Sequence, residues 1–506
     1  MTGESLRLAE TLGALTLATD LAAGLGNESA LKVCLVATAT AREMSVSGAS
    51  LKTVYNASLL RFLGCTAFAS EEGPLSAGDD IGLRRTLAMV DFGSFRSFAG
   101  RAVRGIASHA SLPVRARALA RLLADPSTPA RHAVAQCEVG AAFARAIGID
   151  GVAEVLALRD ERWDGRGPRG FTGGLPLPAR IADVADVAEL FAWHHGIGEA
   201  KAELGRRSAG QLDPDVVRAV DDPLWEGVFD PSVWELYLDA EPGPPRLATS
   251  PDEIGRVLEA WSLFADLASV FTLGHGGRVG RLCAAVAEAV GLGDDDRRLA
   301  GWAGWVHDLG RVGVPNGIWD KPGPLTPFER ERVRLHSTYT ETILRSSAGL
   351  AELADVATAT HERASGRGYP RRLALEREPL LARIVAVADV YVALRSDRPH
   401  RPAFDPEGAA RELRGMESLD RHVVDGVLAV QGHTRPRRAE PRGLTDRERE
   451  VVRLVAIGRT NPEIGALLGM SPRTAQKHVM NVYDKLGIES RAALALYAVE
   501  HGLLDT

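Results

Sequence analysis

Apolar residues recur at three- and four-residue spacing along most of the chain, and clusters of Gly, Pro and Asp interrupt them at intervals. This spacing places apolar side chains on one face of a helix. Alternation of apolar and polar residues with a period of two, which is typical of strands, is nearly absent. We therefore predict an all-α protein built from many short helices.

Two segments rich in proline and charged residues interrupt this pattern. The first is DAEPGPPRLATSPDE, over 239–253, and the second is GHTRPRRAEPRG, over 432–443. A chain of 506 residues is also too long for a single hydrophobic core. We predict three domains, two helical ones followed by a compact terminal module, over 1–240, 250–432 and 441–506.

The two helical domains share an internal repeat. Residues 161–186 read ERWDGRGPRGFTGGLPLPARIADVAD, and residues 362–389 read ERASGRGYPRRLALEREPLLARIVAVAD. Both contain ER, a pair of glycines around an arginine, ARI and VAD in the same order. Further matches flank this segment, at 57–64 with 303–310 and at 212–220 with 419–427. Chance similarity of two helices is the alternative, but matches in one order favour a duplication.

Composition and charge exclude several classes of protein. The hydrophobic fraction of 45% is ordinary for a globular chain, and the net charge of -6 argues against nucleic-acid binding along the whole length. The N-terminus lacks the basic start of a signal peptide, and no segment is apolar enough to span a bilayer. The four cysteines lie far apart without a CxxC pair, as in a reducing compartment. We expect a cytoplasmic protein with no membrane partner.

Histidines and aspartates recur through the second domain in an order that indicates a metal site. They are His275, His307, Asp308, His336, His361 and Asp389. Imidazole and carboxylate groups together bind divalent Fe, Mn or Zn. Taken singly, each histidine is more ordinary as a surface or core residue. The adjacent His307 and Asp308, however, lie in the apolar helix AGWVHDLG, where an unpaired carboxylate is costly.

These residues and their surroundings resemble the HD-GYP family, the phosphodiesterases that hydrolyse cyclic di-GMP. The resemblance covers about 250–430 and depends on HDLGRVGVPNGIWDKPGPLTPFE (307–329), HERASGRGYP (361–370) and ARIVAVADVYVALRSDRPHR (382–401). It implies two divalent transition-metal ions, Fe or Mn rather than Zn. The ligands of the first would be His275, His307, Asp308 and Asp389. Asp308, as a bridge, would hold the second with His336 and His361.

The resemblance also implies roles in catalysis and substrate binding. Asp308 and Arg311 would be catalytic residues in a metal-assisted attack of water on phosphorus. The substrate-binding residues would be Arg398 and Arg401, which match positions that grip phosphates, with Gly368 and Tyr369 of the GYP motif. The expected ligand is a cyclic dinucleotide or another phosphorylated small molecule.

Four positions depart from the family pattern. Thr360 replaces the first of two adjacent histidines, and Ser365 replaces an aspartate. Phe271 replaces a glutamate that would bind a third metal, and Arg311 replaces a lysine. Arginine holds a phosphate but does not act as a proton donor. Six ligands suffice for two metals, so the sequence is compatible with both an active and an inactive site.

The first domain lacks most of these ligands. The equivalent places hold Ser29, Arg61, Phe62, Cys137 and Asp160, and only Asp186 matches a ligand of the second domain. A single carboxylate beside an arginine does not bind a metal. We interpret this domain as a degenerate copy that acts as a structural partner. The pair His194 and His195 has no carboxylate close by in sequence, and we do not expect it to bind metal.

Residues 444–504 form a different kind of module. Thr445 and Glu448 predict a capping box, while Asn461-Pro462 and Ser471-Pro472 predict the starts of two further helices. A short helix, a Leu-Gly turn and a basic helix make up a helix-turn-helix, in a module of four helices. The stretches LTDREREVVRL, NPEIGALLGMSPRT and KHVMNVYDKLGIESR resemble the LuxR-type (GerE-like) DNA-binding domain.

This second resemblance implies a DNA-binding face on the third helix of the module. The buried stripe is predicted to be Ala475, Val479, Val482 and Leu486. The residues expected to face the groove are Gln476, Lys477 and Met480, and those expected to meet phosphate are Arg473 and Thr474. The last helix, from Ser490 to Leu503, would join two chains into a homodimer on DNA.

The sequence thus predicts a DNA-binding transcriptional regulator in which the second of two HD-type helical bundles binds metal and a phosphorylated nucleotide. Two alternatives remain. In one, the chain is foremost a cyclic di-GMP phosphodiesterase and DNA binding is secondary. In the other, neither bundle is catalytic and both serve as a ligand-sensing scaffold. Metal content and turnover separate these hypotheses.

Overall fold

The computed structural model describes most of the chain between residues 6 and 503. The segments outside the description within that span are 68–71, 73–75, 95–96, 99, 101–104, 108–109, 126–127, 172–173, 221–224, 226–232, 249, 364, 375–376, 434–443, 487–490, 492–493, 495–496 and 499–502. The described residues contain no strand, and their only extended pairings are isolated bridges. The protein is all-α, as the sequence pattern predicts.

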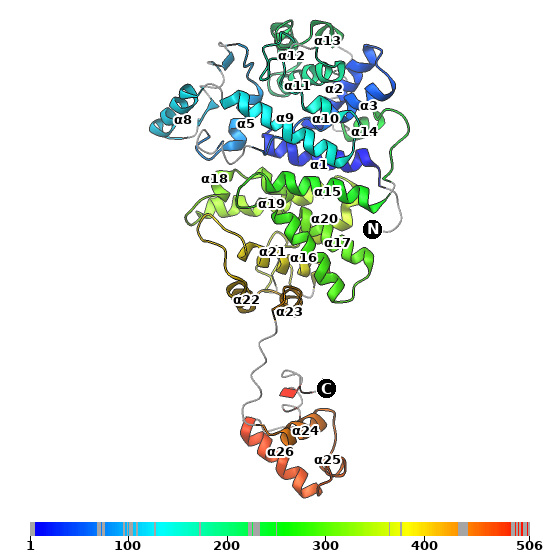
Figure 1. The fold of residues 1–506 in the computed structure, drawn as a ribbon, viewed down its shortest axis with the longest axis vertical. Helices are drawn as coiled ribbons and strands as arrows, with labels where there is room; N and C mark the ends of the chain where they lie inside the picture. Colours follow the sequence, from blue (N-terminus) through cyan, green and yellow to red (C-terminus); the bar gives the residue numbers. More distant parts are fainter. Residues whose placement is uncertain are drawn as a thin grey trace. The chain divides into compact units, whose positions relative to one another are not determined.

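The first half of the chain is a bundle of helices built mainly on α2 and α11, which pack against each other (Figure 1). Its helices are α1 (Leu8–Ala23), α2 (Ser29–Glu43), α3 (Gly48–Leu59), α5 (Asp80–Ala88), α8 (Leu112–Ala124), α9 (Thr128–Ile147), α10 (Val152–Leu156), α11 (Leu177–His195), α12 (Ile197–Arg207), α13 (Pro214–Ala219) and α14 (Val233–Asp239). The apolar faces of α2, α3 and α11 close a core around Val33, Val54 and Phe191.

The second half is centred on α16, α17 and α21, which pack against one another. Its elements are α15 (Pro251–Asp266), α16 (His275–Ala289), α17 (Asp294–Val306), the 3₁₀ helix η3 (Leu309–Gly313), α18 (Asn316–Trp319), α19 (Pro327–Arg345), η4 (Ala348–Leu350), α20 (Ala351–Ala357), α21 (Leu380–Leu394), α22 (Pro406–Gly415) and α23 (Arg421–Val430). A capping box between Thr326 and Glu329 fixes the start of α19.

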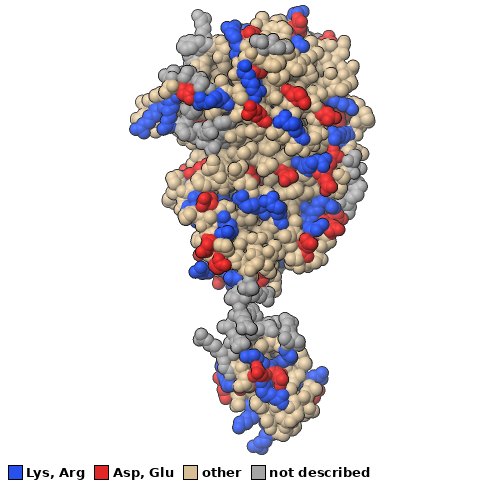
Figure 2. All heavy atoms as spheres, viewed as in Figure 1, with Lys and Arg blue, Asp and Glu red and all other residues tan. Residues whose placement is uncertain are grey.

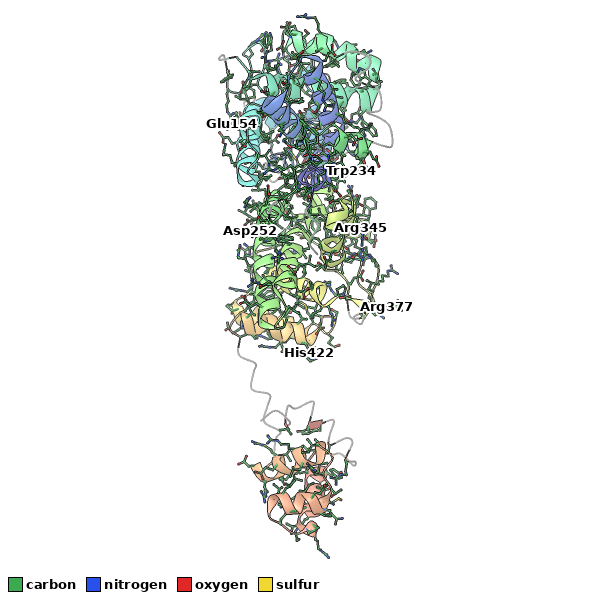
Figure 3. The ribbon with its side chains drawn as sticks, turned by 90° about the vertical axis from the view of Figure 1, so that its right-hand side faces the viewer. Glu154, Trp234, Asp252, Arg345, Arg377 and His422 are labelled. Atoms are coloured by element: carbon green, nitrogen blue, oxygen red, sulfur yellow. The ribbon has the colours of Figure 1, made fainter. Side chains whose placement is uncertain are left out.

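The two halves share one hydrophobic core. Residues 1–430 form one compact unit, and α1 of the first half packs against η3 and α19 of the second. The indole nitrogen of the buried Trp261 donates a hydrogen bond to the carbonyl of Leu15 (2.7 Å), and the hydroxyl of Thr66 donates to that of Phe264 (2.7 Å). Figure 3 shows the halves stacked, with Glu154 and Trp234 in one half and Arg345 in the other. Burial of large apolar side chains across this boundary stabilises both halves together.

The C-terminal unit, residues 431–506, has its own small core. It contains α24 (Asp446–Ala456), α25 (Asn461–Leu468) and α26 (Pro472–Leu486). The capping box predicted at Thr445 and Glu448 is present, and Ala475, Val479 and Val482 are buried as predicted. Most of the expected fourth helix, 490–503, lies outside the described residues.

The apolar length of the helices and the distribution of charged side chains are two further features of the described residues. None of the helices in the described part of the chain combines the length and the apolar composition needed to cross a bilayer. Figure 2 shows basic and acidic side chains interspersed over the visible face of residues 6–433. This mixed surface is consistent with the prediction that any contact with nucleic acid is local and does not extend along the whole chain.

Candidate metal centre

The His307-Asp308 pair lies in a sharp turn between α17 and η3. Helix α17 ends at Val306, and η3 begins immediately after Asp308. The turn lies directly against α19: a Cβ on Gly310 would come within 2.2 Å of the carbonyl oxygen of His336. The hydroxyl of Thr340 accepts a hydrogen bond from the Gly310 nitrogen (2.9 Å) and donates one to the His307 carbonyl (3.2 Å). A glycine and a threonine thus hold the turn beside His336.

Close packing of two helices brings His275 to the same place. Helix α16 begins at His275 and crosses α17 where Gly280 meets Gly304; a Cβ on Gly304 would lie 2.7 Å from the Gly280 Cα. Because neither residue has a side chain, the backbones approach closely, and the imidazoles of His275 and His307 come to 5.6 Å between ring centres. Asp389, from the middle of α21, completes this side.

The six predicted ligands converge on one buried site. Asp308 faces two groups of imidazoles with its two carboxylate oxygens: Oδ2 lies 3.8 Å from the Nε2 atom of His307, and Oδ1 lies 3.3 Å from Nε2 of His336 and 3.8 Å from Nε2 of His361. Asp389 Oδ1 lies 3.1 Å from Nε2 of His275. Two sets of potential ligands therefore share Asp308, the arrangement that two ions with a bridging carboxylate need.

The ring nitrogens of this site are prepared for metal ions. Nδ1 of His307 lies 2.9 Å from the Gly304 carbonyl, and Nδ1 of His336 is close to the Val333 carbonyl, so each Nδ1 is placed to donate to a carbonyl while each Nε2 faces the site, where it would bind an ion. Nε2 of His307 is buried without a hydrogen-bond partner. The Nε2 atoms of His336 and His361 point at each other, 2.8 Å apart. Buried lone pairs aimed at a common point fit divalent cations.

Charges in the site favour ionised carboxylates. Burial opposes ionisation of Asp308 and Asp389, but the nearby histidines hold the pKa of each carboxyl well below its usual range. Burial also opposes a charge on His307, yet the carboxylates of Asp308 and Asp389 raise its pKa to about 9. Burial lowers the pKa of His361 to about 4. Two anionic carboxylates in a buried ring of imidazoles create a site that favours cations.

Arg311 and the GYP loop border the ligands. The Arg311 guanidinium is buried, lies 3.8 Å from Asp308 and covers the ring of Trp319 at 3.8 Å from its centre. Its Nε atom has no partner, and burial lowers the pKa of the group. Tyr369 stacks on His361 with 4.9 Å between ring centres. Gly368 makes this possible, because a Cβ there would lie 2.5 Å from the His361 carbonyl oxygen.

The two arginines predicted to bind phosphate have different surroundings in the structure. Arg398 is close enough to Arg311 for its charge to lower the pKa of the Arg311 guanidinium. Arg401 instead donates hydrogen bonds to the carbonyls of Ala393 (2.9 Å), Pro402 (3.1 Å) and Leu394 (3.3 Å) at the end of α21. Cations at a helix C-terminus stabilise its free carbonyls. The Arg401 guanidinium thus caps the end of α21, and its contact with phosphate stays a prediction.

Two residues of the site escaped the sequence interpretation. Trp319 covers Arg311, touches His336 edge-on and donates its indole N–H to the Arg311 carbonyl (3.2 Å). Both carboxylate oxygens of Asp266 accept from the Gly276 nitrogen (3.3 and 3.0 Å) next to His275. A comparison of the repeats carries a signal for Asp266, since TDLA at 19–22 corresponds to ADLA at 265–268.

In the first half an arginine occupies the equivalent centre. Arg61 is buried and its Nε lies 2.6 Å from Asp186, while Ser29 donates to Glu189 (2.8 Å). Gly64 abuts the carbonyl of Gln136 just as Gly310 abuts that of His336. If the two halves are a duplication, this contact would pair Gln136 with His336, one residue before the expected Cys137.

Cys137, His194 and His195 in the first half do not belong to any group of described residues with metal-ligand geometry. The thiol of Cys137 donates to the Arg159 carbonyl (2.8 Å). Among the described residues, the groups with metal-ligand geometry contain neither His194 nor His195. The guanidinium of Arg61 pairs with Asp186, and that of Arg159 lies close enough to act on the same carboxylate. Within the described part of the chain, metal-ligand clusters occur in the second half only.

The predicted DNA-contacting residues lie on one exposed face of α26. Arg473, Thr474, Gln476, Lys477 and Met480 are exposed, whereas Ala475 and Val479 between them are buried. The hydroxyl of Ser471 and that of Thr474 are 2.7 Å apart at the start of the helix. An exposed helix with basic residues in its first turns is the form in which a helix-turn-helix enters a DNA groove.

Comparison with known proteins agrees with both parts of the molecule. A family described as "HD domain" matches residues 262–423, and one described as "Bacterial regulatory proteins, luxR family" matches residues 442–498. The 3′3′-cGAMP-specific phosphodiesterase 3 of Vibrio cholerae is 30% identical over 406 residues, which cover 78% of this chain and 88% of the relative. The chain belongs to the HD-GYP phosphodiesterase family.

Two further comparisons also match this HD-GYP chain to phosphodiesterases. A cyclic di-GMP phosphodiesterase of Thermotoga maritima is 36% identical over 184 residues, and the match spans 36% of this chain and 50% of that relative. A crystal structure of a cyclic GMP-AMP specific phosphodiesterase of V. cholerae has a TM-score of 0.59 at 24% identity, covering 85% of this chain and 99% of that chain. This last likeness establishes the shared fold.

Proposed function

We propose that the protein is a DNA-binding regulator whose second half is a metal-dependent phosphodiesterase for 3′3′-linked cyclic dinucleotides. The observation that carries this proposal is the position of Asp308, whose two oxygens face two separate groups of buried imidazoles. A carboxylate in that position bridges two divalent ions. The V. cholerae relative that matches this chain over 88% of its length is a 3′3′-cGAMP-specific phosphodiesterase, which supports the same substrate class here.

In this proposal the histidines and aspartates would bind two metal ions, and two arginines would bind phosphate. His275, His307, Asp308 and Asp389 would hold one ion, and Asp308, His336 and His361 the other, with Fe or Mn preferred. Bound ions would lower the pKa of water and polarise the phosphodiester. Arg311, held in place by Trp319, would donate hydrogen bonds to a phosphate oxygen. Arg398 would bind the second phosphate, because its charge lies near that of Arg311.

The remaining parts would serve localisation and support. Residues 441–506 would bind DNA through α26, as a homodimer. Residues 1–240 would be a degenerate copy of the domain over 250–432, with Arg61 supplying the charge that metal ions supply in the second half. Matching contacts support this duplication: Arg180 pairs with Asp213 at 2.6 Å as Arg383 pairs with Asp420 at 2.7 Å.

Metal analysis of purified full-length variants tests the bridge. We expect two Fe or Mn ions per chain in the unaltered protein, none in Asp308→Ala and one in Asp389→Ala, because Asp389 faces only the His275 side. Asp295→Ala, in the exposed first turn of α17, is the matched control and should keep both ions. Hydrolysis of 3′3′-cGAMP and cyclic di-GMP should follow the ion content. Equal metal content in Asp308→Ala and the unaltered chain would contradict the proposal.

A further inference from the structure

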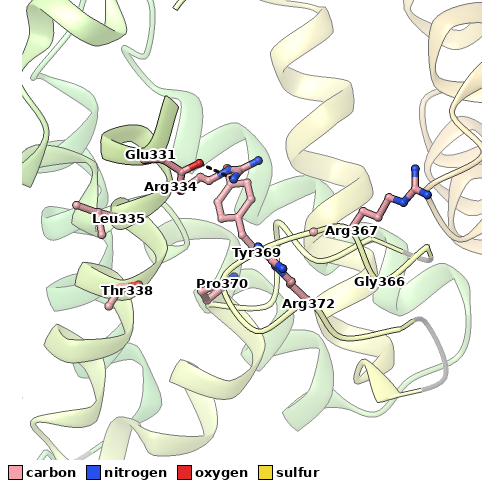
Figure 4. A pocket seen from close by; sticks show the side chains of 10 residues that line it. Glu331, Arg334, Leu335, Thr338, Gly366, Arg367, Tyr369, Pro370 and Arg372 are labelled. Atoms are coloured by element: carbon pink, nitrogen blue, oxygen red, sulfur yellow. Dashed lines mark hydrogen bonds and ion pairs between the residues drawn. The ribbon is translucent and has the colours of Figure 1, made fainter. Parts of the chain in front are cut away.

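A cavity of about 420 Å³ lies beside the metal centre, between α19 and the GYP loop (Figure 4). One face of the helix supplies Glu331, Arg334, Leu335 and Thr338, which follow the i, i+3, i+4, i+7 spacing. The loop supplies Gly366, Arg367, Gly368, Tyr369, Pro370 and Arg372. The volume is in the range of sites that hold small organic ligands.

The side chains of this cavity combine a ring, a carboxylate and a guanidinium. Arg334 and Glu331 form an ion pair at 2.7 Å, and both remain largely open to solvent. The Arg334 guanidinium lies over the ring of Tyr369 at 5.7 Å from its centre. Figure 4 shows this pair and the ring converging on one side of the cavity. Acceptors, donors and a flat surface are thus available together.

The cavity is directly connected to the metal centre through Tyr369. The same ring that lines the cavity stacks on the ligand His361 and touches His336 edge-on at 6.0 Å. Burial raises the pKa of the phenol, so the ring is neutral. Tyr369 therefore borders both the metal centre and the cavity.

We infer that the cavity binds a guanine base of the cyclic dinucleotide, with the side chains of Glu331 and Arg334 reading its edges. This inference rests on the proposed phosphodiesterase function. Guanine presents N–H donors that match a carboxylate, and O6 and N7 acceptors that match a guanidinium. Adenine has no second donor beside its amino group and no O6 acceptor. It would therefore leave hydrogen-bonding groups of Glu331 and Arg334 without partners. Glu331 and Arg334 are therefore specificity-determining residues for guanine-containing substrates.

Exchange of the carboxylate for an amide tests this assignment. Glu331→Gln keeps the size of the side chain but replaces an acceptor by a donor, and a glutamine is a good partner for adenine. We expect the ratio of kcat/KM for cyclic di-GMP to that for cyclic di-AMP to fall by about tenfold. Arg334→Ala should also lower this ratio, by removal of the donor to O6 and N7. Arg330→Ala removes the same charge from an exposed position of α19 outside the cavity and should leave the ratio unchanged.

Two further measurements separate this inference from the proposed function. The unaltered chain is assayed with bis(p-nitrophenyl) phosphate, which has no base, and equilibrium binding of the two cyclic dinucleotides is measured for each variant. Hydrolysis of the base-free ester with an unchanged selectivity in Glu331→Gln would overturn the guanine assignment and leave the phosphodiesterase intact. If the unaltered chain hydrolyses no ester, the catalytic proposal fails. The binding ratio then decides the guanine site: a tenfold shift in Glu331→Gln supports it, and an unchanged ratio overturns it.

Discussion

The carboxylate of Asp80, in the first half of the chain, accepts a hydrogen bond from the backbone nitrogen of Asn316 in the second half, at 2.8 Å. Its other oxygen accepts from Arg84 (2.7 Å), which also pairs with Glu72 (2.7 Å). Asn316 begins the short helix α18, which ends at Trp319, the residue that covers Arg311. A buried ion network of one half thus supports the segment that positions Arg311 in the other.

Asp80→Ala tests this connection. The change leaves the Asn316 nitrogen without its acceptor and reduces the charge that balances the buried Arg84 guanidinium, so we expect a loss of about 3 kcal/mol in the free energy of unfolding. Hydrolysis should fall further than the fraction of unfolded chain explains, because Trp319 loses its support. Chemical unfolding and the KM for cyclic dinucleotides measure the two effects.

Asp80→Asn is the conservative counterpart. The amide oxygen still accepts from Asn316, while the charge opposite Arg84 is lost. If the contact with Asn316 positions the site, this variant should lose stability but keep the KM of the unaltered chain. An equal rise in KM in both variants would show that the ion network, and not the hydrogen bond across the halves, is what matters.

Arg61 has a corresponding role inside the first half. It is buried beside Asp186, and Glu189 lies in the same place with a pKa that burial raises to about 7. Arg61→Met keeps the length of the side chain but removes the guanidinium that pairs directly with Asp186, which we expect to destabilise the protein by about 3 kcal/mol. The metal content should not change, because the ligand groups lie in the second half. Loss of metal in a folded Arg61→Met chain would contradict separate roles for the halves.

The family pattern in the sequence was sufficient to predict which histidines and aspartates come together in the structure; that they bind metal stays a prediction. The capping boxes were equally predictable, because Thr445 and Glu448 interact within one turn of helix. Both kinds of feature depend on local spacing or on a family pattern. Neither requires knowledge of which helix faces which.

Contacts between distant segments could not be predicted in this way. An apolar stripe on α1 shows that it packs against something, but not that its partner is η3 or α19. Arg401 illustrates the same limit, since an arginine after a helix satisfies carbonyls as readily as phosphates. The contact between Trp319 and Arg311 depends on the fold of the loop between them. That loop has no regular spacing of apolar residues from which the contact could be predicted.

Asp20 should make stability depend on pH. Burial raises the pKa of this carboxyl to about 8, compared with about 3.9 in an unfolded chain. Between these values the folded chain retains a proton that the unfolded chain has released, so stability falls as pH rises from about 4 to about 8 and the effect then stops. Asp20→Asn keeps an acceptor for the Ala30 nitrogen but cannot ionise. Its stability relative to the unaltered chain should therefore increase from pH 5 to pH 8.

Thermal unfolding at several pH values measures this difference. Asp252→Asn, an exposed carboxylate near the start of α15 that is labelled in Figure 3, serves as control and should follow the unaltered chain throughout. Parallel curves for Asp20→Asn and the unaltered chain would show that the Asp20 carboxyl is ionised in the folded protein.

The last prediction concerns the exposed face of α26. Lys477 is exposed and follows Gln476, two residues after the buried Ala475. It lies in the part of the helix that is expected to enter the groove in a LuxR-type domain. We expect Lys477→Ala to weaken binding to a selected duplex by about 1–3 kcal/mol and to relax the preference at one base position. Arg473→Ala should instead weaken binding to all sequences and reduce the salt dependence by about one counterion. Duplexes selected by the full-length chain from a random pool, followed by titrations at several salt concentrations, measure both effects.

Lys485→Gln is the matched control for this pair. It removes the same charge from the last turn of the same helix, and the amide can still donate to Glu448, the present partner of Lys485 at 2.8 Å. Because Lys485 lies about two turns of helix beyond Lys477, its loss should change the overall affinity slightly and the base preference not at all. If Lys477→Ala behaves like Lys485→Gln, then Lys477 contributes only charge, and another face of the module reads the bases. If the full-length chain binds no duplex even at low salt, where phosphate contacts are strongest, the DNA-binding role fails.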